Sequence, residues 1–209
     1  MIFLILHFIV CESYIFRNYY NLTQDTVEKK IDKNGSVTQV SLDNITIIGD
    51  SAFYSYNKLE YVVTTSSLKS IEQYAFYNCS SLISITFDEQ SNLETIGNYA
   101  FSYCSNLKTI KLTPSLTEIS SHLFEGCTEL KSITIISNIY EIQDYAFFNC
   151  YNLDCFLYYG TVQPKVNSSS FLGCKKLNAV IAYNTRYISE SFGTLKGLRG
   201  RTSPTKRFF

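Results

Sequence analysis

Apolar and polar side chains alternate in short segments that recur along the middle of the chain. One segment reads Leu-Lys-Thr-Ile-Lys-Leu-Thr, and alternation with a period of two is typical of a β-strand with one buried face. We expect Ile110 and Leu112 to point into a core. Thr109, Lys111 and Thr113 are then expected to point outward.

Three landmark residues follow these segments at fixed offsets. The first landmark, a phenylalanine, recurs at spacings of 23, 25, 23, 23 and 24 residues. The phenylalanines are Phe53, Phe76, Phe101, Phe124, Phe147 and Phe171. Three places later stand Tyr56 and then Cys79, Cys104, Cys127, Cys150 and Cys174. A leucine follows each after three more residues, so six units share one register and form an internal repeat.

Each unit predicts one coil of a solenoid. The alternating segment forms a short strand, a polar cluster or Pro114 turns the chain, and a second apolar segment follows at Leu116 and Ile119. A Tyr-Ala-Phe segment then makes about one helical turn, and the phenylalanine fills the core. One unit cannot bury its apolar side alone, whereas stacked units bury a continuous core. We therefore predict a right-handed α/β solenoid of about six repeats with short parallel strands and short helical turns.

The repeated unit resembles that of the BspA-like leucine-rich repeat family. The residues that carry the resemblance are Ile48-Gly49-Asp-Ser-Ala52-Phe53 and Ile96-Gly97-Asn-Tyr-Ala100-Phe101-Ser-Tyr-Cys104. The resemblance covers about residues 37–183 and implies a leucine-rich repeat fold. It also implies a secreted or surface-located protein, since members are proposed to act in adhesion to host cells, matrix proteins or other microbes.

The pattern divides the chain into four parts. Residues 1–13 begin with a short apolar run and are predicted to be a signal peptide, with a buried N-terminal strand as the alternative. Residues 14–47 form an N-terminal cap with a degenerate repeat, and residues 48–183 form the repeat array. Residues 184–209 form a C-terminal cap and a basic tail. No later stretch is long and apolar enough for a transmembrane span.

Charge and sequons agree with an extracellular binding protein. The net charge is zero, but residues 1–193 hold 13 basic and 18 acidic residues, a balance of −5. The basic charge lies in the tail rather than on a folded face, which argues against nucleic acid as a partner. Five asparagines stand in possible glycosylation sequons: Asn21, Asn34, Asn44, Asn78 and Asn167.

The sequence offers little for catalysis or for a cofactor. Of the two histidines, His7 lies in the predicted signal peptide and His122 occupies a column that is otherwise tyrosine. The cysteine column lacks the close pairs of a zinc site, so we expect no metal. Because His122 has no nucleophile and orienting group beside it and the nine glycines form no phosphate loop, we expect no enzyme and no cofactor. The column can be buried free thiols or disulfides between neighbouring coils. Cys155 lies outside it, as a reactive thiol or as a tolerated small residue.

The outward strand positions suggest one candidate binding surface. Most of the face is small and polar, whereas its C-terminal end is apolar and aromatic. We name this end the C-terminal patch, and it consists of Ile136, Leu157, Tyr159, Ile181 and Tyr183. Such patches mark interfaces, although the C-terminal tail could instead fold over this one as a cap.

These observations predict a non-enzymatic, secreted or cell-surface leucine-rich repeat protein. Its partner is expected to be an extracellular protein or glycan, with adhesion to a host cell or matrix as one role. The alternatives are a structural or antigenic surface component, and a truncated repeat protein without a defined ligand. Self-association through the same face is a further possibility.

Overall fold

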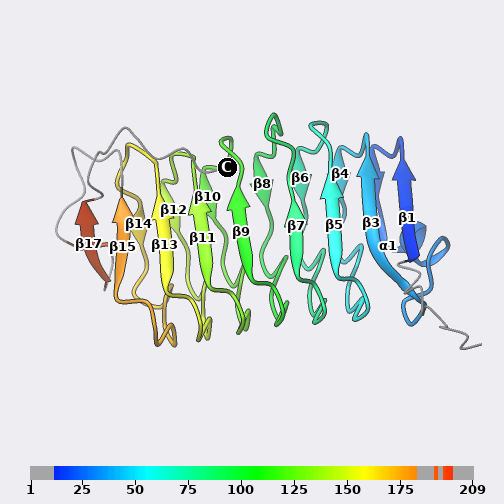
Figure 1. Ribbon diagram of the computed structural model, residues 1–209. Coiled ribbons are helices and arrows are strands. Elements are labelled where there is room, and N and C mark those ends of the chain that lie inside the picture. Colours follow the sequence, from blue (N-terminus) through cyan, green and yellow to red (C-terminus); the bar gives the residue numbers. More distant parts are fainter. Residues whose placement is uncertain (1–11, 183–190, 193–194, 200–209) are drawn as a thin grey trace, which may run out of the picture.

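A computed structural model describes residues 12–182, 191–192 and 195–199 (Figure 1). The predicted signal peptide up to Cys11, Tyr183 of the C-terminal patch and most of the predicted tail lie outside the described residues. Among the predicted parts, residues 14–47 contribute strands to the same sheets as the array, as described below.

One long row of parallel strands runs along the front of the molecule (Figure 1). Its strands are β1 (Glu12–Arg17), β3 (Val37–Asp43), β5 (Tyr61–Thr64), β7 (Ser84–Thr86), β9 (Thr109–Leu112), β11 (Ser132–Ile135), β13 (Cys155–Tyr158) and β15 (Ala179–Ala182). At the far end, β17 (Leu195–Arg199) continues the row parallel to β15, and β16 (Ser191–Phe192) pairs with β17 in antiparallel orientation. The cap predicted at this end therefore includes strands that extend the front sheet.

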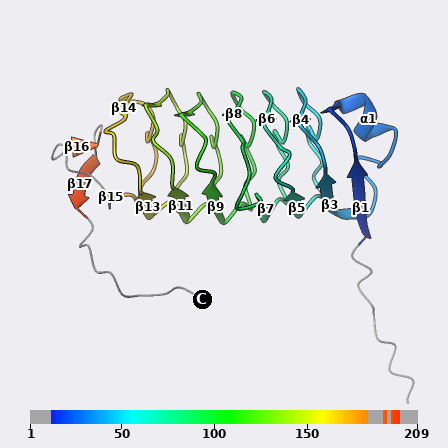
Figure 2. The same ribbon diagram turned by 90° about the horizontal axis from the view of Figure 1, so that it is seen from above.

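A second row of two-residue strands runs along the back, opposite the first (Figure 2). It consists of β2 (Asn21–Leu22), β4 (Ile47–Ile48), β6 (Ser70–Ile71), β8 (Thr95–Ile96), β10 (Glu118–Ile119), β12 (Glu141–Ile142) and β14 (Lys165–Val166). The helix α1 (Gln24–Glu28) lies beside β1, and Thr23 caps it by accepting a hydrogen bond from the Thr26 amide. The described chain thus forms a solenoid of about seven turns, which confirms the predicted leucine-rich repeat fold.

The register of the front strands follows the predicted alternation. Ile110 and Leu112 are buried whereas Thr109 and Lys111 are exposed. The prediction for Thr113 was wrong, because this residue is 4% exposed and its hydroxyl donates a 3.0 Å hydrogen bond to the Leu93 carbonyl. The strand ends at Leu112, so the alternation no longer applies to the residue that enters the turn.

The segments predicted as helical turns are short hydrogen-bonded turns rather than α-helix in the described repeats. Their chain adopts left-handed backbone conformations at two places in most coils. One place precedes the alanine, as at Tyr99 with φ 59°, and the other precedes the cysteine, as at Tyr103 with φ 59°. A left-handed residue cannot continue a right-handed helix, so each coil turns sharply and remains flat.

Two columns of identical side chains hold the coils in register. The Phe rings stack nearly parallel, with Phe124 at 5.7 Å from Phe101 and 5.4 Å from Phe147 between ring centroids. Beside them, each cysteine thiol donates a hydrogen bond to the Phe carbonyl of the preceding coil, as Cys127 does to Phe101 at 3.1 Å. In the first unit Tyr56 takes the cysteine place and donates to the Ile31 carbonyl instead.

The front and back rows are both interrupted at the same coil. The strand ladder breaks between β7 and β9 on the front and between β8 and β10 on the back. No backbone hydrogen bond joins residues 84–86 to residues 109–112, all of which the structure describes. The interruption coincides with the longest unit, in which Phe76 and Phe101 are 25 residues apart.

Candidate functional site

Over β9, β11 and β13, the outward side chains of the front sheet lie in two rows. Ser132 lies between Thr109 and Cys155, and Thr134 lies between Lys111 and Leu157. Strand pairing places neighbouring positions about 4.8 Å apart, so each row is continuous over β9, β11 and β13. The front face is therefore a preformed surface that the core holds rigidly.

Four of the five C-terminal patch residues lie within the described chain. Ile136 is 37% exposed, while Leu157, Tyr159 and Ile181 are partly buried. Leu157 and Ile181 are direct cross-strand partners on β13 and β15. Ile136 and Tyr159 follow the ends of β11 and β13 and therefore lie at one edge of the sheet. The grouping of these residues as a binding surface remains a proposal.

A groove opens on the front face where the sheet is interrupted. It has a volume of about 340 Å³ and is lined by β7, β9 and the residues that directly follow them, with Phe87, Pro114 and Ile136 among its apolar walls. Glu89 and Lys111 also line it, and their side chains form a 3.8 Å ion pair. This ion pair is exposed to solvent, so it is weak and easily rearranged. We call this feature the split-sheet groove.

Sequence reasoning identified one residue of the split-sheet groove, Ile136, and missed Phe87 and Glu89. The available signal was the 25-residue spacing between Phe76 and Phe101, which differs from the usual 23.

A second hollow lies beside the first, over β1, β3 and β5. Its volume is about 300 Å³, and Tyr14, Ile15, Tyr61 and Val63 line it. Ile15 and Val63 are each 48% exposed, which is high for residues of their type in a strand. Ser84 and Thr86 border both hollows, so the two hollows adjoin each other over β7.

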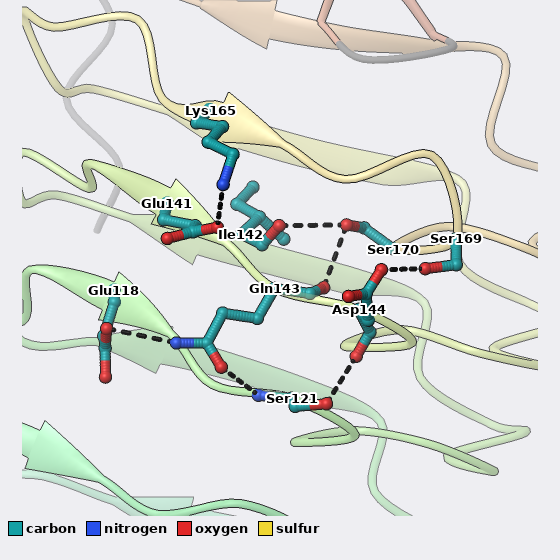
Figure 3. Close-up of polar contacts among 9 residues, drawn as sticks. All are labelled: Glu118, Ser121, Glu141, Ile142, Gln143, Asp144, Lys165, Ser169 and Ser170. Carbon is teal, nitrogen blue, oxygen red and sulfur yellow. Dashed lines mark hydrogen bonds and ion pairs between the residues drawn. The ribbon is translucent and has the colours of Figure 1, made fainter.

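The back face uses its polar side chains to tie neighbouring coils together (Figure 3). Glu118 and Glu141 are cross-strand partners, so their like charges repel. Lys165 approaches Glu141 at 2.8 Å between Nζ and Oε1. Gln143 donates from Nε2 to Glu118 at 3.2 Å and accepts a 3.1 Å hydrogen bond from the Ser121 amide at Oε1. The charges on this face are therefore compensated within the solenoid.

Serine hydroxyls extend the same network around the edge of the back face (Figure 3). Ser169 donates to the Asp144 carboxylate. The buried Ser170 donates to the carbonyls of Ile142 at 3.0 Å and Gln143 at 2.9 Å. Because these groups bond across coils, the back face acts as a support and the front face is the better candidate for a partner.

His122 lies in the tyrosine column, which runs along the turns of successive coils. Its ring stacks between Tyr99 at 4.4 Å and Tyr145 at 5.0 Å, which places it in the tyrosine column as predicted. Its Nδ1 lies 2.6 Å from the Glu125 carboxylate. The other Glu125 oxygen accepts a 2.9 Å hydrogen bond from the Tyr103 hydroxyl, and this bond is the largest cause that raises the pKa of Tyr103 to about 12.

The cysteines within the described residues are free thiols. Burial raises the pKa of the Cys79 thiol to about 12 and that of Cys104 well above its ordinary value. Because each column thiol donates to a carbonyl, its proton contributes to the packing between coils. Cys155 is partly buried on the front face, and desolvation raises its pKa as well.

The five sequon asparagines lie in different surroundings. Asn21, Asn34 and Asn44 are exposed, whereas Asn78 and Asn167 are partly buried. The Asn78 amide donates to the Ser55 hydroxyl at 3.1 Å, and the Asn44 amide donates to Asn18 at 2.9 Å. Asn34 is therefore the most open of the five, and glycosylation at any of them remains a prediction.

Within residues 12–182, 191–192 and 195–199, no group of three or more His, Cys, Asp or Glu side chains is placed to hold a metal ion. In the same part of the chain, no helix has the length and apolar character needed to cross a bilayer.

The sequence profile of the BspA type leucine-rich repeat region matches residues 25–154 with six copies. The chain therefore belongs to the BspA-type leucine-rich repeat family. No curated protein matches the chain.

Solved structures give the same fold. A leucine-rich repeat protein from T. pallidum is 32% identical with a TM-score of 0.61, and the match covers 68% of this chain and 65% of that one. A leucine rich cell surface protein from Faecalibacterium prausnitzii is 20% identical with a TM-score of 0.52, over 73% of this chain and 49% of that one. This chain thus spans less than two thirds of either relative's length, and the second likeness shows the fold alone.

Proposed function

We propose that this chain is a non-enzymatic binding module that holds an extracellular protein or glycan on the front face of its sheet. The observation that carries the proposal is the contrast between the two faces. Around β10, β12 and β14 the back face pairs its charged groups across coils, whereas the front face presents small polar rows, apolar side chains and two adjoining hollows.

A rigid front face suits binding for a physical reason. The strands β11 and β13 are anchored by fully buried side chains such as Ile133 and Phe156, so their outward rows are in place before a partner arrives. Little conformational entropy is then lost on docking, and more of the contact energy appears as affinity. Tyrosine at the C-terminal patch, here Tyr159, is a residue type favoured as an anchor in interfaces.

The proposed location is the cell surface or the extracellular space. The apolar run at residues 1–11 supports this proposal, as does the description of the F. prausnitzii relative as a cell surface protein. Adhesion to a host cell or to matrix proteins is the proposed role within this location.

A binding screen against extracellular matrix proteins, glycans and cell surfaces tests the proposal, run with and without reductant. Once a ligand is found, Leu157→Ala and Tyr159→Ala are each expected to weaken it by about tenfold or more, since anchor residues contribute at least 1–2 kcal/mol. The matched control is Tyr151→Ala, because Tyr151 is 38% exposed in the same coil but lies in the turn after Cys150. This control is expected to leave binding unchanged.

The alternatives predict different results. Self-association that rises with concentration and is weakened by Leu157→Ala and Tyr159→Ala would favour a structural surface component or an incomplete array. If neither substitution weakens any interaction, or if Tyr151→Ala weakens binding equally, the front face is not the binding surface.

A further inference from the structure

The last described strand ends at the same edge of the front sheet as the split-sheet groove. Strand pairing connects Leu112 to Ile135, Ile135 to Tyr158 and Tyr158 to Ala182, and Ala182 pairs with Arg199. These residues form one row, and the groove includes Leu112 at the opposite end of that row. Four steps of about 4.8 Å separate the two ends, a distance of about 19 Å.

Residues 200–209 follow β17 and are long enough to cross this distance. Ten residues span at most about 33–36 Å when extended, which leaves length for several residues to lie in the groove. The row passes Tyr159 and Ile136 of the C-terminal patch, which directly follow Tyr158 and Ile135. A chain that leaves β17 along this edge therefore crosses the patch before it reaches the groove.

The chemistry of the segment complements that of the groove. Its sequence is Gly-Arg-Thr-Ser-Pro-Thr-Lys-Arg-Phe-Phe, with three basic residues, no acidic residue and two aromatic rings. The groove offers Phe87, Pro114 and Ile136 for apolar contact. Asp88 and Glu89 at its rim are both exposed, and the Glu89 side chain is 90% exposed. Its one lysine, Lys111, already faces Glu89.

We propose that residues 200–209 dock along this edge of the front sheet and place their aromatic end in the split-sheet groove of the same chain. The basic residues face Asp88 and Glu89, and the phenylalanines contact the apolar wall at Ile136. The segment then covers the C-terminal patch and competes with any ligand of the front face. The docking itself involves only this chain, so it does not depend on the proposed function.

The absence of tryptophan from the chain allows a direct test. Phe209→Trp introduces a single indole as a reporter in the otherwise intact protein. Docking is expected to shift its emission to shorter wavelength than that of the free peptide of residues 200–209 with the same substitution. It is also expected to lower the acrylamide quenching constant several-fold relative to that peptide.

Charge reversal locates the contact. Asp88→Lys and Glu89→Lys are introduced together into the Phe209→Trp protein. The emission wavelength and the quenching constant are then expected to return most of the way to the values of the free peptide. The matched control is Glu94→Lys, because Glu94 is an exposed carboxylate of the same unit that directly precedes β8 on the back. This control is expected to retain the protected emission. The double variant and the Glu94→Lys control both alter exposed side chains, so circular dichroism should report an intact fold in each variant.

Three outcomes would overturn the proposal. The first is an indole in the intact chain that behaves like the free peptide. The second is protection that survives reversal of Asp88 and Glu89, which would place the segment elsewhere. The third is protection that appears only as protein concentration rises, which would mean that the segment occupies a second copy of the chain.

Discussion

Removing one ring from the middle of the phenylalanine column should cost the solenoid a large part of its stability. Phe124 is fully buried and stacks on both sides, with ring centroids 5.7 Å and 5.4 Å away and planes within 16° of parallel. Phe124→Ala therefore removes one buried ring and two ring contacts, and leaves a cavity inside a continuous core.

The size of this effect follows from the ring's surroundings. Replacing a buried phenylalanine by alanine costs about 3–5 kcal/mol, and the value depends on how well the site can collapse. The neighbouring coils are fixed by strands on both sides, so we expect about 4–5 kcal/mol for Phe124→Ala. Phe171 stands at the end of the column, is 6% exposed and has one parallel neighbour, Phe147, at 5.1 Å. Phe171→Ala should cost less, about 3 kcal/mol.

Equilibrium unfolding in urea, followed by circular dichroism, measures both free energies of unfolding. Domains of this kind have total stabilities of about 5–15 kcal/mol, so the central variant should unfold at a much lower urea concentration. A cost below about 1 kcal/mol for Phe124→Ala, or a larger cost for Phe171→Ala, would refute a core in which each ring is held by its neighbours.

Three other perturbations test separate parts of the structure. Gly97→Ala should destabilise the fold by about 1–3 kcal/mol in the same urea assay, because an added Cβ would lie 2.5 Å from the Gln73 backbone nitrogen and the backbone cannot give way. Alkylation with iodoacetamide at pH 8, followed by mass spectrometry, should label Cys155 and Cys174 but leave the buried thiols unmodified until denaturant is added; labelling of native Cys104 would contradict the hydrogen-bonded column. Stability should fall as pH rises from about 10 to about 12. The pKa of Tyr103 in the folded protein is raised to about 12, so the unfolded chain loses this proton at a lower pH than the folded chain does. Tyr103→Phe should therefore make the free energy of unfolding fall less steeply with pH, as measured by urea titration at each pH.

The sequence was sufficient to predict the features that every coil repeats. The positions of Phe, Cys and Leu predicted the buried columns, and the strand alternation predicted which side chains face outward, with His122 in the tyrosine column. These features are predictable because one unit cannot be stable alone, so each coil must repeat the contacts of its neighbours.

The backbone conformation of the turns and the features of single coils were harder to predict. The turns depend on left-handed residues such as Tyr99 and Tyr103, and tyrosine carries no sequence signal for that conformation. The split-sheet groove lies where β9 does not pair with β7, beside the longest unit. The 25-residue spacing marks this unit but does not predict where the strand ladder breaks. Thr113 was misplaced because the end of a strand depends on the turn that follows.

Hydrogen-exchange footprinting of the protein with the first ligand found by the binding screen tests the central claim most directly. The claim is that the front face is the binding surface. Our account predicts slowed exchange in residues 109–114, 132–136 and 155–159, which form the front strands and their groove-side ends. Slowed exchange confined to the turn segments 97–104, 120–127 and 143–150, with the front strands unchanged, would contradict it.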